Sequence, residues 1–178
     1  MELLINYTVT QKKQGDIMKQ KEHLPIFGIG PFLVAGMALT AVISLILFCY
    51  IFRIGTLSGF AAVLFRIIGA ALSIAGVTVW FIGSMCSGMD GNIKENRLKT
   101  DGIYAWVRNP MYSGFWMLIS GISLMWHNIF LIPVIFINQG IMTVVLKNTE
   151  EKWLRDLYGQ EYIDYCKKVN RCVPWKRK

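Results

Sequence analysis

Long uncharged stretches alternate with short polar segments along most of the chain. Residues 31–52 and 67–85 contain no charged side chain, and residues 111–146 contain no acidic or basic side chain other than His127. About 20 consecutive apolar residues make a helix long enough to cross the hydrocarbon core of a bilayer. The first two stretches therefore predict one membrane span each, and the third is long enough for two.

The third stretch is divided near its middle. Trp126, His127 and Asn128 form a polar interruption, and Pro133 follows at a position where the first turn of a new helix tolerates proline. We expect a tight helical hairpin, with His127 in the turn and not acting as a ligand. The predicted fold class is all-α, a multi-pass transmembrane helical bundle with about four spans, at residues 31–52, 64–86, 110–126 and 130–148.

Polar segments flank the predicted bundle. Residues 1–30 form a polar N-terminal arm, and residues 31–178 form a single domain that ends in a polar tail, residues 149–178. Apolar side chains recur in this tail at helical spacing, at Trp153, Leu154, Leu157, Tyr158, Tyr162 and Tyr165. The tail therefore predicts an amphipathic helix, bent or broken at Gly159, against the membrane surface.

The distribution of charge predicts the orientation of the protein. The net charge is +8, and most basic residues lie in the arm, in the loop of residues 87–109 and in the tail. Because cytoplasmic segments of membrane proteins are enriched in lysine and arginine, these segments and both termini are expected in the cytoplasm. Arg66 is expected at the outer interface. This asymmetry explains the basic excess without a nucleic-acid partner.

The sequence favours neither a signal peptide nor a site built from cysteines. Residues 1–24 are polar and lack the apolar core of a signal peptide. The four cysteines show no CxxC spacing, so neither a disulfide framework nor a metal site is expected. Small residues within the second span, among them Gly69 and Gly76, predict close helix packing in the membrane.

The predicted hairpin brings two polar clusters together. Its legs have similar lengths and the same rise per residue, so residues 108–112 and 147–151 should face each other at the cytoplasmic interface. Asn109 is a favourable N-cap and Pro110 a favourable first helical residue. The helix that begins there presents its positive end, which can bind an anion.

Side chains around this helix start could form a binding site. Arg108 adds a cation, and Glu150 and Glu151 add carboxylates. Aromatic walls come from Tyr104, Trp106 and Tyr112. Such a set suits a zwitterionic cofactor with an aromatic base. An ordinary capped helix with interfacial anchors and a solvated glutamate pair accounts for the same residues, so the residues alone leave both interpretations open.

Two segments carry a family resemblance. LKTDGIYAWVRNPMYSGF and TEEKWLRDLYGQEYIDYCKKVNRCVPW resemble the C-terminal signature of the isoprenylcysteine carboxyl methyltransferase family, to which membrane phospholipid methyltransferases are similar. The matching parts are a GxY segment, an Arg-x-Pro-x-Tyr-x-Gly motif, a hairpin, a glutamate pair and a Gly-x-Glu-Tyr segment. They occur in this order over roughly residues 96–175.

The resemblance implies an integral membrane methyltransferase that uses S-adenosylmethionine from the cytoplasm. Its acceptor would be lipid-borne or an apolar small molecule bearing a carboxylate, thiol or amine. Carried over by position, the cofactor contacts are Asn96, Arg97, Leu98, Lys99, Tyr104, Asn109, Pro110, Met111, Tyr112 and Glu150. Arg108 and Glu151 join this set from the hairpin geometry.

Two positions depart from the family pattern. Asn109 stands where the family carries a histidine, so any role that needs an imidazole proton is absent. Leu146 stands where prenylcysteine enzymes carry an arginine, which leaves Lys147 as the candidate substrate contact. An NADPH-dependent membrane reductase of the sterol-reductase type and a non-catalytic membrane scaffold are the alternative functions.

Overall fold

A computed structural model describes residues 28–85 and 97–173, and all the regular elements in these ranges are helices. The elements are α2 (Gly30–Leu45), the π-helix η1 (Ile46–Ile51), α3 (Gly59–Ser84), the 3-10 helix η2 (Gly102–Ala105), α5 (Pro110–Met125), α6 (Leu131–Asn148), α7 (Glu150–Tyr158) and α8 (Gln160–Lys168). The all-α prediction is confirmed for this part of the chain. Most of the predicted arm and Asn96 lie outside the described residues.

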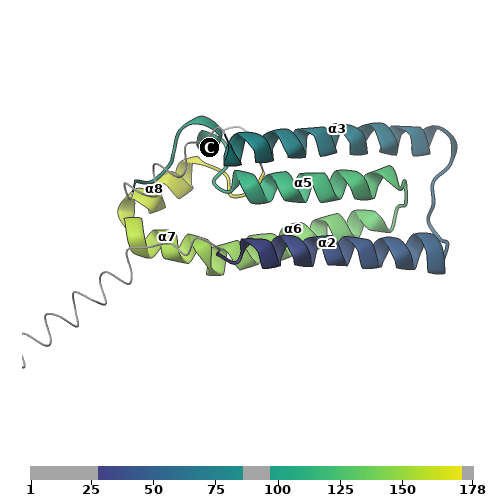
Figure 1. Ribbon diagram of the computed structural model, residues 1–178, viewed down its shortest axis with the longest axis horizontal. Coiled ribbons are helices and arrows are strands. Elements are labelled where there is room, and N and C mark those ends of the chain that lie inside the picture. Colours follow the sequence, from purple (N-terminus) through teal and green to yellow (C-terminus); the bar gives the residue numbers. More distant parts are fainter. Residues whose placement is uncertain (1–27, 86–96, 174–178) are drawn as a thin grey trace, which may run out of the picture.

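Four long helices run side by side (Figure 1). Helices α7 and α8 extend from one end of this bundle, which we call the α7–α8 end. Residues 53–58 and 126–130 connect the long helices at the opposite end, which we call the turn end. The predicted hairpin is α5 and α6, and Pro133 falls in the first turn of α6 as expected.

Three helices are long and apolar enough to cross a membrane: Gly30–Ile51, Gly59–Ser84 and Leu131–Tyr158. Side chains such as Phe60 and Ile74 are largely exposed on them, which suits contact with lipid. Helix α5 has 16 residues, about 24 Å, and a bilayer core is ~30 Å thick. The chain is therefore an integral membrane protein, and the count of four spans stays a prediction.

Helices α3 and α5 pack with their backbones in contact. Glycines recur every seventh residue along both helices, at Gly69, Gly76 and Gly83 on α3 and at Gly114 and Gly121 on α5. A Cβ added at Gly76 would lie 2.7 Å from the Gly114 carbonyl oxygen, and one added at Gly114 would lie 2.7 Å from that of Gly76. The small residues of the second span thus have the packing role that the sequence predicts.

The turn end is held by a buried asparagine. The Asn128 side chain donates to the Ile54 carbonyl at 2.7 Å and accepts from the Phe130 N–H at 3.0 Å, so it joins both connecting segments. Helix α3 begins at Gly59, so Arg66 lies inside the helix and not at its start. Its guanidinium donates to His127 Nε2 at 2.9 Å, and His127 is a turn residue, as expected.

Candidate functional site

The start of α5 is fixed by the segment that follows α8. Helix α5 begins at Pro110 with Asn109 at the N-cap position, as predicted. The expected side-chain cap is wrong, because the Asn109 amide instead donates to the Arg171 carbonyl at 3.1 Å. The Asn109 backbone N–H donates to the same carbonyl at 3.1 Å, and the Arg108 N–H donates to the Asn170 carbonyl at 2.9 Å. The C-terminal segment therefore orients the motif.

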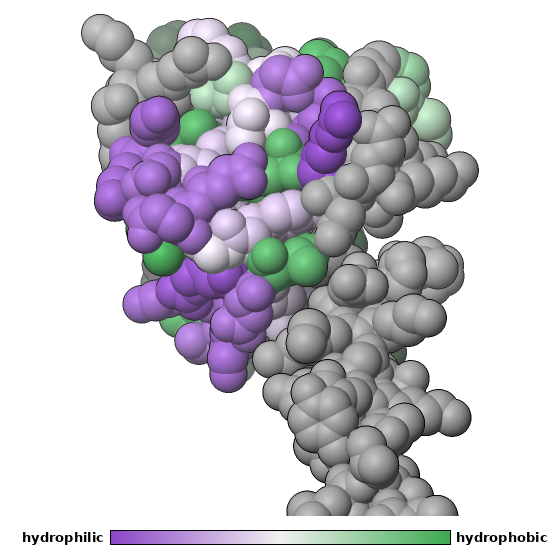
Figure 2. Space-filling model, turned by 90° about the vertical axis from the view of Figure 1, so that its left-hand side faces the viewer, coloured by the Kyte–Doolittle hydropathy of each residue, from purple (hydrophilic) through white to green (hydrophobic). Residues whose placement is uncertain are grey.

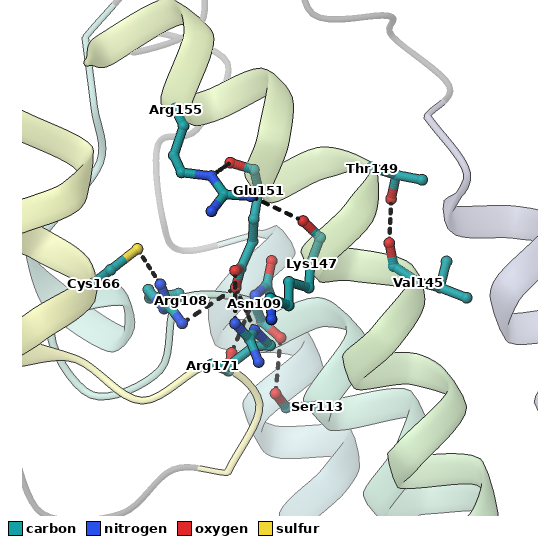
Figure 3. Close-up of polar contacts among 10 residues, drawn as sticks. All are labelled: Arg108, Asn109, Ser113, Val145, Lys147, Thr149, Glu151, Arg155, Cys166 and Arg171. Atoms are coloured by element: carbon teal, nitrogen blue, oxygen red, sulfur yellow. Dashed lines mark hydrogen bonds and ion pairs between the residues drawn. The ribbon is translucent and has the colours of Figure 1, made fainter. Parts of the chain in front are cut away.

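A buried charge cluster lies beside this helix start (Figure 3). Arg171 donates two parallel hydrogen bonds to the Glu151 carboxylate, at 2.7 and 3.0 Å, and Arg108 Nη2 lies 3.2 Å from the same carboxylate. The side chains of Glu151 and Arg108 are 3% and 7% exposed. Because a buried charge is costly without a partner of opposite charge, each of these three side chains depends on the others.

The surroundings shift the ionisation of nearby groups. Hydrogen bonding to Glu151 raises the pKa of the Arg171 guanidinium above its usual value, so this cation stays charged. Burial raises the pKa of the Cys172 thiol to about 12, so Cys172 is a protonated core residue. Burial also raises the pKa of Tyr165, whose hydroxyl donates to the Tyr104 carbonyl at 2.6 Å.

A polar cavity of about 390 Å³ opens next to the charge cluster. Its lining comes from α7, α8 and the segments beside them, at Arg108, Glu151, Arg155, Ile163, Cys166, Val169 and Arg171. Three arginines face one glutamate there, so the cavity carries an excess of positive charge. Arg108 Nη1 also contacts Cys166 Sγ, and Arg108 Nε has no hydrogen-bond partner among the described residues. Figure 2 shows hydrophilic side chains over much of this end of the molecule.

Glu150 lies on a different side of α7 from Glu151, because consecutive helical residues point about 100° apart. Its carboxylate accepts a hydrogen bond from the Tyr112 hydroxyl. Two glycines lie against this pair: a Cβ added at Gly28 would lie 2.9 Å from Glu150 Oε1, and one at Gly30 would lie 2.7 Å from the Tyr112 hydroxyl. The Tyr112–Glu150 pair thus borders the start of α2.

These contacts confirm that residues 108–112 and 147–151 face each other. Other sequence-predicted residues lie around them in different roles. Tyr104 is 3% exposed and Leu98 packs against Tyr162 and Tyr165, so both support α8. Lys99 forms an ion pair with Asp101 at 2.8 Å.

The remaining predicted residues are divided between core and surface. Pro110 is buried and Met111 half-buried at the start of α5. Lys147 is exposed, and its carbonyl accepts from Arg155 Nη2 at 3.2 Å. Leu146, which stands at the family's arginine position, is fully buried in the apolar core beside Leu33 and Met142. Lys147, the next residue, is therefore the cation nearest in sequence to this position.

Sequence reasoning missed Arg171 and Arg155. Arg171 reaches Glu151 from an irregular segment after α8, and no helical spacing predicts that approach. Arg155 lies four residues after Glu151 on α7, so its place on the same face could have been found from helix periodicity. Among the described residues, no group of three or more His, Cys, Asp or Glu side chains is placed to hold a metal ion.

One known protein family matches the central part of the chain. The model of the family described as phospholipid methyltransferase matches residues 54–161, which include α3, the α5–α6 hairpin and α7. The chain belongs to this family. The matched region includes the whole Tyr112–Glu150 pair and two members of the charge cluster, Arg108 and Glu151.

Individual relatives match a shorter part of the chain. A protein-S-isoprenylcysteine O-methyltransferase of Schizosaccharomyces pombe is 34% identical over 88 residues, 46% of this chain and 34% of that protein. Methanethiol S-methyltransferase 1 of Bradyrhizobium diazoefficiens is 36% identical over 84 residues, 46% of this chain and 27% of that protein. The chain thus covers about a third or less of the length of these relatives. No solved structure matches significantly.

Proposed function

We propose that the protein transfers a methyl group from S-adenosylmethionine to a lipid-borne or apolar small-molecule acceptor at the α7–α8 end. The acceptor would carry a thiol, carboxylate or amine. The observation that carries this proposal is the cavity beside the charge cluster, in a chain of the phospholipid methyltransferase family. Family membership favours this function over the reductase and scaffold alternatives.

The residues around the cavity fit the cofactor chemically. A volume of about 390 Å³ lies within the usual range for small-molecule sites. Guanidinium groups of Arg108, Arg155 and Arg171 suit a carboxylate, and Arg108 Nε is a buried donor that no described residue satisfies. Glu150 does not line the cavity, and by the family resemblance its carboxylate is proposed as an acceptor for ammonium or hydroxyl groups.

The two glutamates have different roles in this proposal. Glu151 holds Arg108 and Arg171 in place and so positions the cavity wall. Glu150 and Tyr112 lie together against the start of α2. By the family resemblance, Arg97 and Lys99, in the segment before η2, are also proposed as cofactor contacts.

Bound there, S-adenosylmethionine would supply a methyl group activated by its sulfonium. The protein then has to align donor and acceptor and exclude water, and such positioning can lower a barrier by roughly 7–11 kcal/mol. His127, the one histidine among the described residues, lies at the turn end with Arg66 and cannot act as a base here. Both termini are proposed to be cytoplasmic because most of the basic residues that the structure describes lie at the α7–α8 end, where α2 also begins.

Replacing Glu150 or Tyr112 with alanine is expected to lower methyl transfer by at least about tenfold, since each change breaks the hydrogen bond that holds these two proposed contacts together. Transfer is measured with tritium-labelled methyl donor and lipid, thiol, carboxylate and amine acceptors, in membranes that contain the protein. Glu161→Ala, an exposed position on α8, is the control.

Three results would contradict the proposal. Full transfer in both variants would overturn the site. Oxidation of NADPH without methyl transfer would support the reductase, and neither activity in folded protein would support the scaffold.

A further inference from the structure

A second cavity of about 290 Å³ lies between α2 and α6, away from the charged cavity. Its walls are apolar side chains such as Phe32, Leu33, Ile141 and Val145, and Gly36 on α2 also lines it. Helices α2 and α6 belong to two of the segments that are long and apolar enough to cross a membrane. The cavity is therefore a groove at the depth of the lipid chains, which we call the α2–α6 groove.

One end of the α2–α6 groove is polar. The Thr40 hydroxyl lies 2.7 Å from Asn138 Oδ1, and Asn138 Nδ2 donates to the Met37 carbonyl at 3.3 Å. Asn138 is 4% exposed, so its amide depends on these partners. A purely apolar guest cannot displace Thr40 from Asn138 without leaving buried polar atoms unsatisfied.

The other end of the groove lies beside the Tyr112–Glu150 pair. The groove begins at Ile29, between Gly28 and Gly30, and these two glycines lie against Glu150 and Tyr112. From Ile29 to Thr40 the groove follows α2 for about 16 Å. This length is about half of a ~30 Å bilayer core, which puts Thr40 and Asn138 near its middle.

We propose that the α2–α6 groove holds a single hydrocarbon chain of the methyl acceptor, and that the Thr40–Asn138 pair closes the groove and sets the longest chain it accepts. The continuity with the Tyr112–Glu150 pair identifies the occupant, because a chain in this groove places its head group at that pair. The inference rests on the proposed function for the identity of the head-group site. It adds the chemical class of the acceptor and the two residues that select it.

Two glycines allow one variant that should fill the groove and one matched control. A Cβ added at Gly36 meets no atom within 4 Å, so Gly36→Leu fills the groove without a clash. Gly140 on α6 is equally open but does not line the groove, so Gly140→Leu is the control. The probes are octyl, dodecyl and hexadecyl thiols with a terminal diazirine, incubated with the protein in phosphatidylcholine nanodiscs and located by mass spectrometry after illumination.

In the wild type and in Gly140→Leu, the dodecyl probe is expected to label residues near Thr40 and Asn138. In Gly36→Leu this labelling is expected to fall by about tenfold or more, equivalent to ~1.4 kcal/mol of binding. Equal labelling in Gly36→Leu would overturn the proposal and assign the groove to bulk lipid. Binding of S-adenosylhomocysteine is measured in parallel, because its loss would signal failure of the cofactor site instead.

The length limit is tested separately. The double variant Thr40→Ala/Asn138→Ala removes the polar pair, and the hexadecyl probe should then label the protein as strongly as the dodecyl probe does. Ser44→Ala, one turn further along α2, is the control and should keep the wild-type preference. Equal labelling by the dodecyl and hexadecyl probes in the wild type would overturn the role of the Thr40–Asn138 pair.

Discussion

Replacing Glu151 with alanine is expected to lower the free energy of unfolding by about 3–5 kcal/mol, the usual cost of removing one partner from a buried ion pair. The carboxylate is 3% exposed and accepts from both Arg108 and Arg171. Without it, two guanidinium groups remain close together, and the buried Arg108 loses its counter-charge. The measurement is reversible unfolding of the purified protein in detergent.

The control for this prediction is Glu161→Ala, which removes an exposed carboxylate of the same protein. Such a surface change usually alters stability by less than about 0.5 kcal/mol. If Glu151→Ala were as mild as Glu161→Ala, the charge cluster would not hold the C-terminal segment against α5. Arg171 would then not be what orients Asn109.

Replacing Gly114 with leucine is expected to lower the free energy of unfolding by about 3 kcal/mol, at the upper end of the range for overpacked sites. A Cβ there would lie 2.7 Å from the Gly76 carbonyl oxygen and 2.7 Å from Trp80 N. These are backbone atoms of α3, so they cannot swing aside as a side chain would. Helix α5 would have to move away from α3 and carry the start of the motif with it.

Gly140→Leu is the matched control, since a Cβ at Gly140 meets no atom within 4 Å. Helix propensity alone favours leucine over glycine by up to about 1 kcal/mol, so the control should be as stable as the wild type or more so. Thermal unfolding in the same detergent compares the two variants. Equal stability of both would contradict the close α3–α5 contact.

The sequence predicts the α5–α6 hairpin well because it depends on simple lengths. A turn near Asn128 and legs of similar length bring residues 108–112 close to residues 147–151 without any knowledge of side-chain packing. The all-α class follows from the same uncharged stretches. The position of Arg171 could not be predicted in this way, because it depends on the path of an irregular segment that returns to α5.

The capping preference of asparagine predicted the wrong hydrogen-bond partner for the Asn109 side chain. Asparagine favours side-chain capping, but the Arg171 carbonyl lies within reach and takes both the backbone N–H and the side-chain amide. Glu150 and Glu151 look equivalent in the sequence, and only their helical positions separate a buried partner of two arginines from a partner of Tyr112. Tertiary contacts decided both cases.

We propose that the cavity beside Arg108, Arg155 and Arg171 holds the methyl donor. The most direct test is calorimetric titration of S-adenosylhomocysteine into the wild type, Arg155→Ala and Lys152→Ala. Arg155 and Lys152 are exposed on α7, and only Arg155 lines the cavity. We predict binding to the wild type and to Lys152→Ala, with at least about tenfold lower affinity in Arg155→Ala, as expected for the loss of a hydrogen bond to a charged group. No binding to folded wild-type protein, or equal affinity in all three, would contradict the account.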